Sequence, residues 1–261
     1  MIDIGINLMS SQFDDDREKV LERALSAGVT SMGVTGTSET NSQRAAQFVR
    51  DHPHLWCTAG IHPHEADTAS QDWQRTILTL AEGPQVKAIG ETGLDFNRNY
   101  SDPDVQRARF DDHIQLALQT GLPLFVHDRD SNGAVHAMLA PYRDRLNGVV
   151  IHCFTGDADD LKRYVQAGYY IGITGWVCDP KRGAGLRQLV PLIPTERLVI
   201  ETDAPYLLPY PASSPSPHKR RNEPCLLGHV AARIADLIHR DLDEVSAFTT
   251  RNATTLFRLP T

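Results

Sequence analysis

Two carboxylates and two imidazoles, far apart in the sequence, each stand at or beside the end of a short apolar run. Such runs are typical of buried strands, and the carboxyl ends of parallel strands meet at one edge of an α/β fold. Carboxylate and imidazole groups from separate strands are the ligands that a catalytic divalent cation needs. We therefore predict one metal site at this edge, with four ligands: Glu91, His127, His152 and Asp203.

The elements that must position these side chains alternate along the chain as strand, loop and helix. The predicted strands are apolar throughout, which is typical of a parallel sheet covered on both faces. Eight strand–helix units in about 200 residues favour a (β/α)8 TIM barrel over an open doubly wound sheet, and we expect one hydrolase domain over 1–261. The predicted strands are Ile2–Asn7, Ser31–Gly36, Leu55–Gly60, Val86–Gly90, Leu124–His127, Gly148–His152, Tyr169–Ile173 and Arg197–Thr202.

Helices are predicted from apolar residues at every third or fourth position. Gly28 ends the first helix, and Ser38 caps the second, with Glu39 adding negative charge to its first turn. The proline-rich stretch 205–224 is expected to form neither helix nor strand, and the two final helices are expected to complete the outer ring. The predicted helices are Asp14–Ala27, Ser38–Arg50, Asp72–Ala81, Asp104–Thr120, Asn132–Leu139, Ala158–Ala167, Gly183–Val190, Glu223–His239 and Asp243–Leu256.

The bulk composition limits the possible function classes. The formal net charge of −7 argues against a protein that coats nucleic acid through a basic face, but it permits an enzyme that handles phosphates with a metal and a few local cations. The four cysteines match no zinc or redox spacing, which favours a reduced, cytoplasmic compartment. No signal peptide or membrane-spanning run is found. No exposed apolar stripe stands out, so a monomer is expected.

Ordered motifs surround the predicted site, and through them the chain resembles the TatD family of metal-dependent deoxyribonucleases from residue 3 to about 257. The resemblance implies an amidohydrolase-like barrel and a metal-dependent 3′-5′ exonuclease for single-stranded DNA or RNA, with a role in DNA degradation or repair. The motifs are Gly60-Ile61-His62-Pro63-His64, Gly-Glu-Thr-Gly-Leu-Asp-Phe at 90–96, His127-Asp128-Arg129, His152-Cys153-Phe154-Thr155-Gly156, Gly-Ile-Thr-Gly-Trp at 172–176, Glu201-Thr202-Asp203-Ala204-Pro205-Tyr206-Leu207 and Arg220-Arg221-Asn222-Glu223-Pro224.

The same resemblance implies a role for each site residue. Glu91 anchors the metal, and His127 and His152 supply nitrogen ligands. Asp203 is a further ligand or the general base that orients the attacking water. His62 contacts the substrate phosphate or protonates the leaving oxygen, so the expected catalytic residues are Glu91, Asp203 and His62. Substrate binding is expected at His62, His64, Arg129, Trp176, Tyr206 and Arg221.

Several of these positions also have a structural explanation, which the sequence leaves open. One of His62 and His64 could merely cap a turn fixed by Pro63, and Arg129 could be a solvated loop charge. Trp176 and Tyr206 could stack bases or simply pack against the barrel mouth. Asp95 could orient a ligand or cap a turn. Basic runs at 181–182 and 219–221 lie on predicted active-face loops and favour a phosphate path.

The first strand departs from the family pattern. Most members carry a His-x-His pair there, but this chain has Gly5 and Asn7. The first metal position therefore loses up to two nitrogen donors, and we expect one well-occupied ion held by Glu91, His127 and His152. A second site would be weak or filled only with substrate. Two imidazoles favour zinc or manganese, whereas the resemblance implies Mg²⁺, so Mg²⁺ is expected, with Mn²⁺ or Zn²⁺ as alternatives.

Two other functions fit a barrel of this kind. An amidohydrolase acting on a cyclic amide or ester would use the strand-one histidine pair and often a bridging lysine carbamate. Lys87 lies four residues before Glu91, too early for that bridge. A degraded barrel that only binds a partner is the non-enzymatic alternative, and the retained ligand set argues against it. The sequence leaves DNA against RNA and exonuclease against endonuclease open.

Overall fold

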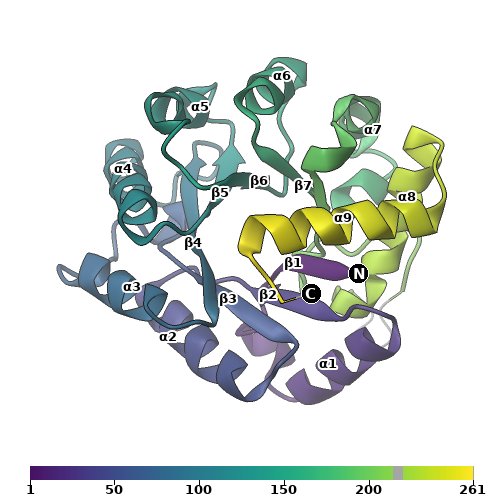
Figure 1. Cartoon of the computed structure of the whole chain (residues 1–261), viewed down its shortest axis with the longest axis horizontal. Coiled ribbons are helices and arrows are strands. Elements are labelled where there is room, and N and C mark those ends of the chain that lie inside the picture. The colour runs from purple at the N-terminus through teal and green to yellow at the C-terminus, as the bar shows by residue number, and fades with distance from the viewer. Residues whose placement is uncertain (214–219, 261) are drawn as a thin grey trace.

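The computed structural model describes residues 1–213 and 220–260, and it contains a barrel of eight parallel strands (Figure 1). The strands are β1 Ile2–Ile6, β2 Ser31–Val34, β3 Leu55–Ala59, β4 Val86–Asp95, β5 Leu124–Arg129, β6 Val149–His152, β7 Tyr170–Ile173 and β8 Leu198–Ile200. They lie in chain order, each paired with the next. Hydrogen bonds from Asp203 N to Gly5 O (2.9 Å) and from Asn7 N to Ala204 O (2.7 Å) bring the end of β8 back to β1. The predicted (β/α)8 barrel is confirmed.

Helices surround the strands, as Figure 1 shows for α1 to α8. The helices are α1 Arg17–Ser26, α2 Glu39–Phe48, α3 Trp73–Ala81, α4 Pro103–Thr120, α5 Ala134–Leu139, α6 Ala158–Ala167, α7 Ala184–Leu189, α8 Leu227–Ile238 and α9 Leu242–Phe257. The predicted cap of α2 is confirmed, because the Ser38 hydroxyl oxygen accepts a hydrogen bond from Asn41 N at 3.2 Å. Among the described residues, no helix has the length and apolar character needed to cross a bilayer.

Strand β4 is longer than predicted, and this places Glu91 inside the strand instead of at its tip. Pairing with β5 continues to Asp95, but the register shifts between Gly90 and Thr92. At this irregularity the Glu91 amide donates to Gly36 O at 2.7 Å. The sequence-based boundary was wrong because Gly90 was interpreted as the end of the strand. The glycine instead lies at a local irregularity within it.

The last helix does not complete the outer ring as predicted, because α9 crosses one end of the barrel (Figure 1). Its final turn contributes Leu256 and Phe257 to an apolar cluster inside the amino-terminal end of the barrel. There the Phe257 ring lies 4.4 Å from Trp56 and 6.5 Å from Phe125, measured between centroids. A second, larger core lies between the strands and the surrounding helices. The barrel is therefore closed by side chains at its amino-terminal end, and only the carboxyl end is left for polar chemistry.

Candidate active site

A cavity of about 580 Å³ opens at the carboxyl ends of the strands. It also collects side chains from the loops that follow β3, β7 and β8. The structure thus brings together, in one cavity, every predicted site side chain except Arg221. They are His62, His64, Glu91, His127, Arg129, His152, Trp176, Asp203 and Tyr206.

Glu91 reaches this cavity because two glycines let β4 run unusually close to β5. Gly90 and Gly93 have φ values of +138° and +136°, which residues with a side chain rarely adopt. A Cβ atom at Gly90 would collide with Phe125 O, and one at Gly93 would collide with His127 O. Glu91, which lies between them, is only 4% exposed. The glycine pair therefore serves close strand packing as well as the change of direction.

Three imidazoles converge on a single oxygen of the Glu91 carboxylate. The contacts to Oε1 measure 2.8 Å from His152 Nε2, 3.2 Å from His127 Nδ1 and 3.2 Å from His62 Nε2. Burial alone would raise the pKa of Glu91, but the neighbouring His152 and His62 outweigh it and hold that pKa well below its usual range. Glu91 is therefore ionised, and it is the shared centre of the cluster.

Two of the three imidazoles have a second carboxylate behind them. His127 Nε2 lies 3.2 Å from Asp95 Oδ2, and His152 Nδ1 lies 3.1 Å from Glu201 Oε2. Burial would lower the pKa of both rings, but Asp95 and Glu91 raise that of His127, and Glu91 and Glu201 raise that of His152. Histidines that bind metal commonly donate their other ring N–H to a carboxylate in this way. His127 Nδ1 and His152 Nε2 are thus the nitrogens that face the Glu91 carboxylate.

His62 is bonded differently. By distance alone, His62, Glu91 and His127 could hold an ion, since their ligand atoms lie within 4.8 Å of one another. However, His62 Nδ1 accepts a hydrogen bond from the His64 amide at 3.0 Å, so a neutral His62 carries its proton on Nε2. Burial lowers the pKa of His62 despite the nearby Glu91, which favours this neutral form. The hydrogen bonds therefore direct an N–H donor, and not a free nitrogen, into the cavity.

The two unusual residues of the first strand shape the other side of the site. Asn7 Nδ2 donates to Asp203 Oδ1 at 2.8 Å, which fixes that carboxyl group. A Cβ atom at Gly5 would collide with the Glu201 carboxylate, so Glu201 occupies the space that a side chain at position 5 would need. Burial raises the pKa of Asp203 to about 7, even though His152 opposes the shift. On this side of the site the Glu201 carboxylate therefore fills the space beside Gly5, and Asn7 holds the Asp203 carboxyl group.

Nearly the whole chain is similar to proteins of one known family. The family model described as TatD related DNase matches residues 2–258. The chain belongs to the TatD family. It is 48% identical over 257 residues to the protein named 3'-5' ssDNA/RNA exonuclease TatD from Enterobacter lignolyticus (strain SCF1), covering 98% of each chain. A protein of the same name from Salmonella typhimurium is 48% identical over 259 residues, and the match covers 99% of each chain.

Solved structures of TatD proteins share the fold along the full chain. The TatD homologue YJJV from Escherichia coli K12 superposes with a TM-score of 0.90 at 28% identity, covering 100% of this chain and 98% of that one. A TatD-family hydrolase from Entamoeba histolytica gives the same TM-score at 25% identity and the same coverage. The architecture is thus the TIM barrel of the solved TatD proteins.

Glu201 is a further residue of the cluster in this TatD-family chain, and it was not among the residues predicted from the sequence. Its Oε1 accepts the Cys153 amide at 2.6 Å, and its other oxygen contacts His152. A carboxylate that directly follows the apolar run Leu198–Ile200 was the available signal, because a buried acid needs partners. Asp95 is supported from α4 as well, since its amide donates to the buried Gln106 Oε1 at 2.8 Å.

Cations and aromatic side chains form the rim of the TatD-family cavity. The Trp176 ring lies between two guanidinium groups, at 5.4 Å from Arg129 and 4.6 Å from Arg182. Arg182 is paired with Asp179 at 2.7 Å, whereas no ion pair forms between Arg129 and any other described residue. Tyr206 is 51% exposed and so does not close the mouth by packing. Arg129 and Tyr206 are therefore accessible to a ligand.

The structure corrects the prediction for Arg221. This side chain is buried, donates to Asp16 at 2.8 Å and to Glu223 at 2.8 Å, and does not line the cavity. Glu223 also accepts from Arg23 at 2.7 Å, so the four residues form a charge network between α1 and the segment before α8. The Arg221 guanidinium therefore binds carboxylates within the protein and is not free for a phosphate. Lys219, in the same basic run, lies outside the described residues.

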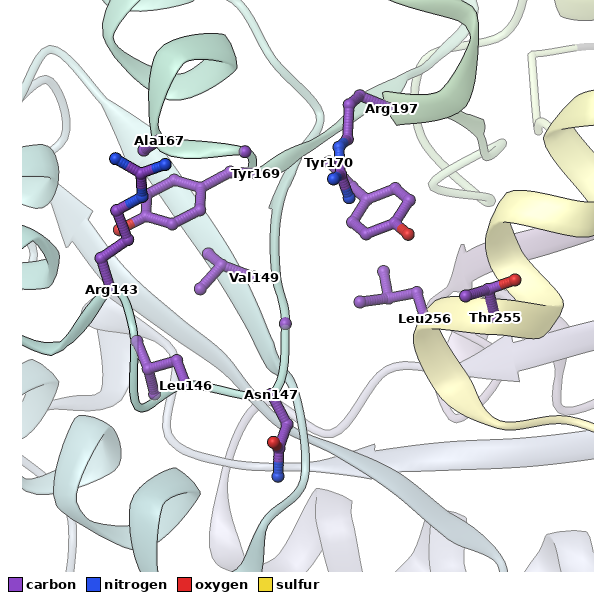
Figure 2. A pocket seen from close by; sticks show the side chains of 12 residues that line it. Arg143, Leu146, Asn147, Val149, Ala167, Tyr169, Tyr170, Arg197, Thr255 and Leu256 are labelled. Carbon is purple, nitrogen blue, oxygen red and sulfur yellow. The ribbon is translucent and has the colours of Figure 1, made fainter.

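A second cavity, of about 240 Å³, lies at the opposite end of the barrel (Figure 2). It opens where β6, β7 and β8 begin, and Figure 2 shows Arg143, Tyr169, Tyr170, Arg197 and Leu256 around it. The described residues that line it include no carboxylate, imidazole or thiol. It therefore lacks the groups for metal binding or general base chemistry, and the cavity around Glu91 is the stronger candidate.

Proposed function

We propose that this TatD-family chain is a metal-dependent nuclease that removes nucleotides from the 3′ end of single-stranded DNA or RNA. The observation that carries the proposal is the convergence of three imidazoles on Glu91, two of them backed by buried carboxylates. The relatives named 3'-5' ssDNA/RNA exonuclease TatD support the substrate and the direction. A cyclic-amide hydrolase is not favoured, because the strand-one histidines and the bridging lysine are both missing.

The donor set fits one divalent cation. Glu91 Oε1, His127 Nδ1 and His152 Nε2 would hold it, and Asp203 stands beside them as a further ligand or as the base. When bound there, the cation polarises a phosphoryl oxygen and neutralises charge that develops in the transition state. We propose Mg²⁺ as the ion, with Mn²⁺ or Zn²⁺ as alternatives, and one tight ion per chain. Calorimetric titration that finds two tight ions would contradict this stoichiometry.

Asp203 supplies a proton transfer, and the neutral His62 ring supplies a hydrogen bond. A base with a pKa of about 7 is suited to accept a proton near neutral pH, and burial gives Asp203 that value. Because Asn7 donates to Oδ1 of Asp203, Oδ2 is left to take a proton from the attacking water. His62 Nε2–H, held by the contact of its Nδ1 with the His64 amide, donates to a phosphate oxygen or to the leaving oxygen.

The rim selects the form of the substrate. The unpaired guanidinium of Arg129 suits a phosphate, and the exposed ring of Tyr206 suits stacking on a base. The Arg129 guanidinium lies over the Trp176 ring, which favours its position at the rim. A confined cavity at the end of a barrel accommodates the flexible end of a single strand better than an intact duplex. His64, which contacts Asp95 at 2.7 Å, adds a polar group at the same wall.

The setting in the cell follows from this activity as part of the proposal. We infer a role in DNA degradation or repair in the cytoplasm, carried out by a monomer with one domain over 1–261. The four cysteines are free thiols, which suits a reduced compartment.

A product ladder tests the function. Purified protein is incubated with single-stranded DNA and RNA labelled at the 5′ or the 3′ end, with Mg²⁺, Mn²⁺ or a chelator, and a panel of cyclic amides is run in parallel. We expect stepwise shortening from the 3′ end that stops with the chelator and in Glu91→Ala. The matched control is Glu196→Ala, which removes an exposed carboxylate before β8. Full activity of Glu91→Ala, or cuts distributed along the strand, would reject the proposal.

A further inference from the structure

A buried histidine outside the cavity contacts the segment that carries His62. His113 lies on α4 and is 0% exposed. Its Nε2 accepts a hydrogen bond from the Ile61 amide at 3.0 Å, and its Nδ1 lies 2.6 Å from Arg109 O. Because a carbonyl needs a donor and an amide N–H needs an acceptor, only the neutral ring with its proton on Nδ1 satisfies both contacts.

The surroundings of His113 favour the neutral ring. The ring stacks on Trp73 from α3, with centroids 4.6 Å apart and planes 23° apart. Burial lowers the pKa of His113 to about 4, so the ring stays neutral at physiological pH. Leucine or phenylalanine would fill this apolar layer without a polar atom, so the imidazole is present for its two hydrogen bonds.

The amide that His113 holds belongs to the residue immediately before His62. On the other side of that residue, the His62 amide donates to Thr37 O at 2.8 Å. The chain between β3 and His62 is therefore fixed on two successive amides, one by an imidazole and one by a carbonyl. Farther along, α4 and the turn before it contact the same loop again, because Arg109 Nε donates to Ala66 O at 3.3 Å and Ser101 Oγ donates to His64 O at 3.1 Å.

The orientation of the His62 ring depends on this backbone. Its Nδ1 accepts from the His64 amide, and its Nε2 lies 3.2 Å from Glu91. The Ile61 amide that His113 holds belongs to the Gly60–Ile61 peptide, which leads directly into His62. A shift of this peptide would move His62 and both of its ring contacts together, and misplacement of a reacting group by about 1 Å can cost 100-fold in rate. We propose that His113 is a positioning residue, which aims the His62 N–H donor by accepting the Ile61 amide hydrogen.

The alternative is that His113 is only a well-packed core residue. Three variants separate the two roles. His113→Leu keeps the volume of the layer but removes the acceptor, and His113→Gln offers an amide oxygen to Ile61 and an amide N–H to Arg109 O. Trp73→Phe is the matched control, because it weakens the packing on the ring and leaves both hydrogen bonds of His113 in place.

The kinetic test rests on the proposed nuclease function. We expect kcat for oligonucleotide cleavage to fall about 10- to 100-fold in His113→Leu, with KM nearly unchanged. This is the effect expected of a residue that orients a catalytic group without contacting the substrate. His113→Gln should recover most of the rate, and Trp73→Phe should lower the melting temperature without this loss. In a His62→Ala background, His113→Leu should add no further loss, since its effect passes through His62. An equal loss in both backgrounds, or none in the parent protein, would overturn the proposal.

A second readout does not depend on cleavage. Nitrogen-detected NMR of histidine-labelled protein reports the tautomer of each ring, and we expect His113 to show a protonated Nδ1 and a bare Nε2 across pH 5 to 8. In His113→Leu the His62 ring signals should shift or broaden. If the parent protein cleaves none of the substrates, the proposed function fails while this measurement still decides the coupling. Unchanged His62 signals in His113→Leu would refute it.

Discussion

On β5, Phe125 and His127 face the same side of the sheet because they are two residues apart, yet they belong to opposite ends of the barrel. Phe125 packs with Phe257 in the apolar cluster at the amino-terminal end, whereas His127 lines the cavity at the carboxyl end. Strand β6 repeats the pattern with Val150 and His152. The boundary between the two regions is a direct contact, since the rings of Phe125 and His152 stack with centroids 4.8 Å apart.

On these strands, residues only two positions apart thus serve different purposes: the first packs in the apolar core, and the second lines the cavity. The amino-terminal end buries large apolar side chains, which favours folding. The carboxyl end buries ionisable groups, which costs free energy unless each group is paired. In this barrel they are paired, with three imidazoles around the Glu91 carboxylate. We therefore expect substitutions at the two ends to affect different measurements.

The largest expected effect is on activity, at the carboxyl end. Glu91→Gln should lower the cleavage rate by about 1,000-fold or more, because the shared anionic centre of the cluster is lost. The fold should survive, with a melting temperature equal to or above that of the parent protein, since a buried charge is removed. Single-turnover kinetics and circular dichroism measure the two quantities. Loss of the folded state would contradict the separation.

The matching change at the amino-terminal end is Phe257→Ala. It should lower the free energy of unfolding by about 3–5 kcal/mol, since a fully buried ring leaves a cavity beside Trp56. At a temperature where the variant is folded, its cleavage rate should match that of the parent protein. Urea denaturation gives the first value. A large change in kcat in folded protein would show that the two ends are coupled.

Glu201→Gln tests the supporting layer of the site. The side chain should still accept from the Cys153 amide, but it loses the charge that faces His152. We expect activity to fall about 10- to 100-fold and calorimetric metal affinity to weaken in parallel. If metal affinity stays the same while activity falls, Glu201 acts on the substrate side instead.

The charge network of Asp16 should affect stability alone, although the sequence had placed Arg221 with the substrate. The hydrogen bond from Arg221 lowers the pKa of Asp16 to about 2. A carboxylate with a lowered pKa stabilises the fold above its unfolded pKa of about 3.9, and this contribution is lost as the pH falls from about 4 towards 2. Asp16→Asn should therefore cost about 2 kcal/mol at pH 7 and almost nothing near pH 2. The KM of Asp16→Asn should equal that of the parent protein. A raised KM would indicate that Arg221 contributes to substrate binding after all.

The smallest effects come from two arginines that lie over aromatic rings at opposite ends. Arg197 lies 4.9 Å from the Tyr170 ring beside the cavity in Figure 2, and Arg129 lies 5.4 Å from Trp176. Arg197→Ala should lower stability by about 0.5–1 kcal/mol and leave cleavage unchanged. Arg129→Ala should raise KM several-fold with little effect on stability. Equal KM values for the two variants would remove Arg129 from the proposed phosphate contacts.

Much of the site was predictable because metal ligands and their strands leave local signals. Apolar runs ending in His127 and His152 indicate buried strands, and parallel strands must bring their carboxyl ends together, so the convergence followed from the order of the elements alone. The motifs around them were sufficient for the family. The apolar faces of α1 to α8 likewise predicted the ring around the barrel, whereas α9 was wrongly placed in that ring.

What the sequence could not determine depends on partners distant along the chain. Arg221 stands in a basic run, and only the fold shows that Asp16 and Glu223 neutralise it. Gly90 indicates a turn in isolation, but the continued pairing with β5 makes it an irregularity within a longer strand.

The same is true of the direction in which His62 points its proton. That direction depends on the His64 amide and on the amide held by His113 from α4. A sequence specifies which groups are available, whereas pairing energies and burial depend on which groups meet, and that is decided only when the barrel closes.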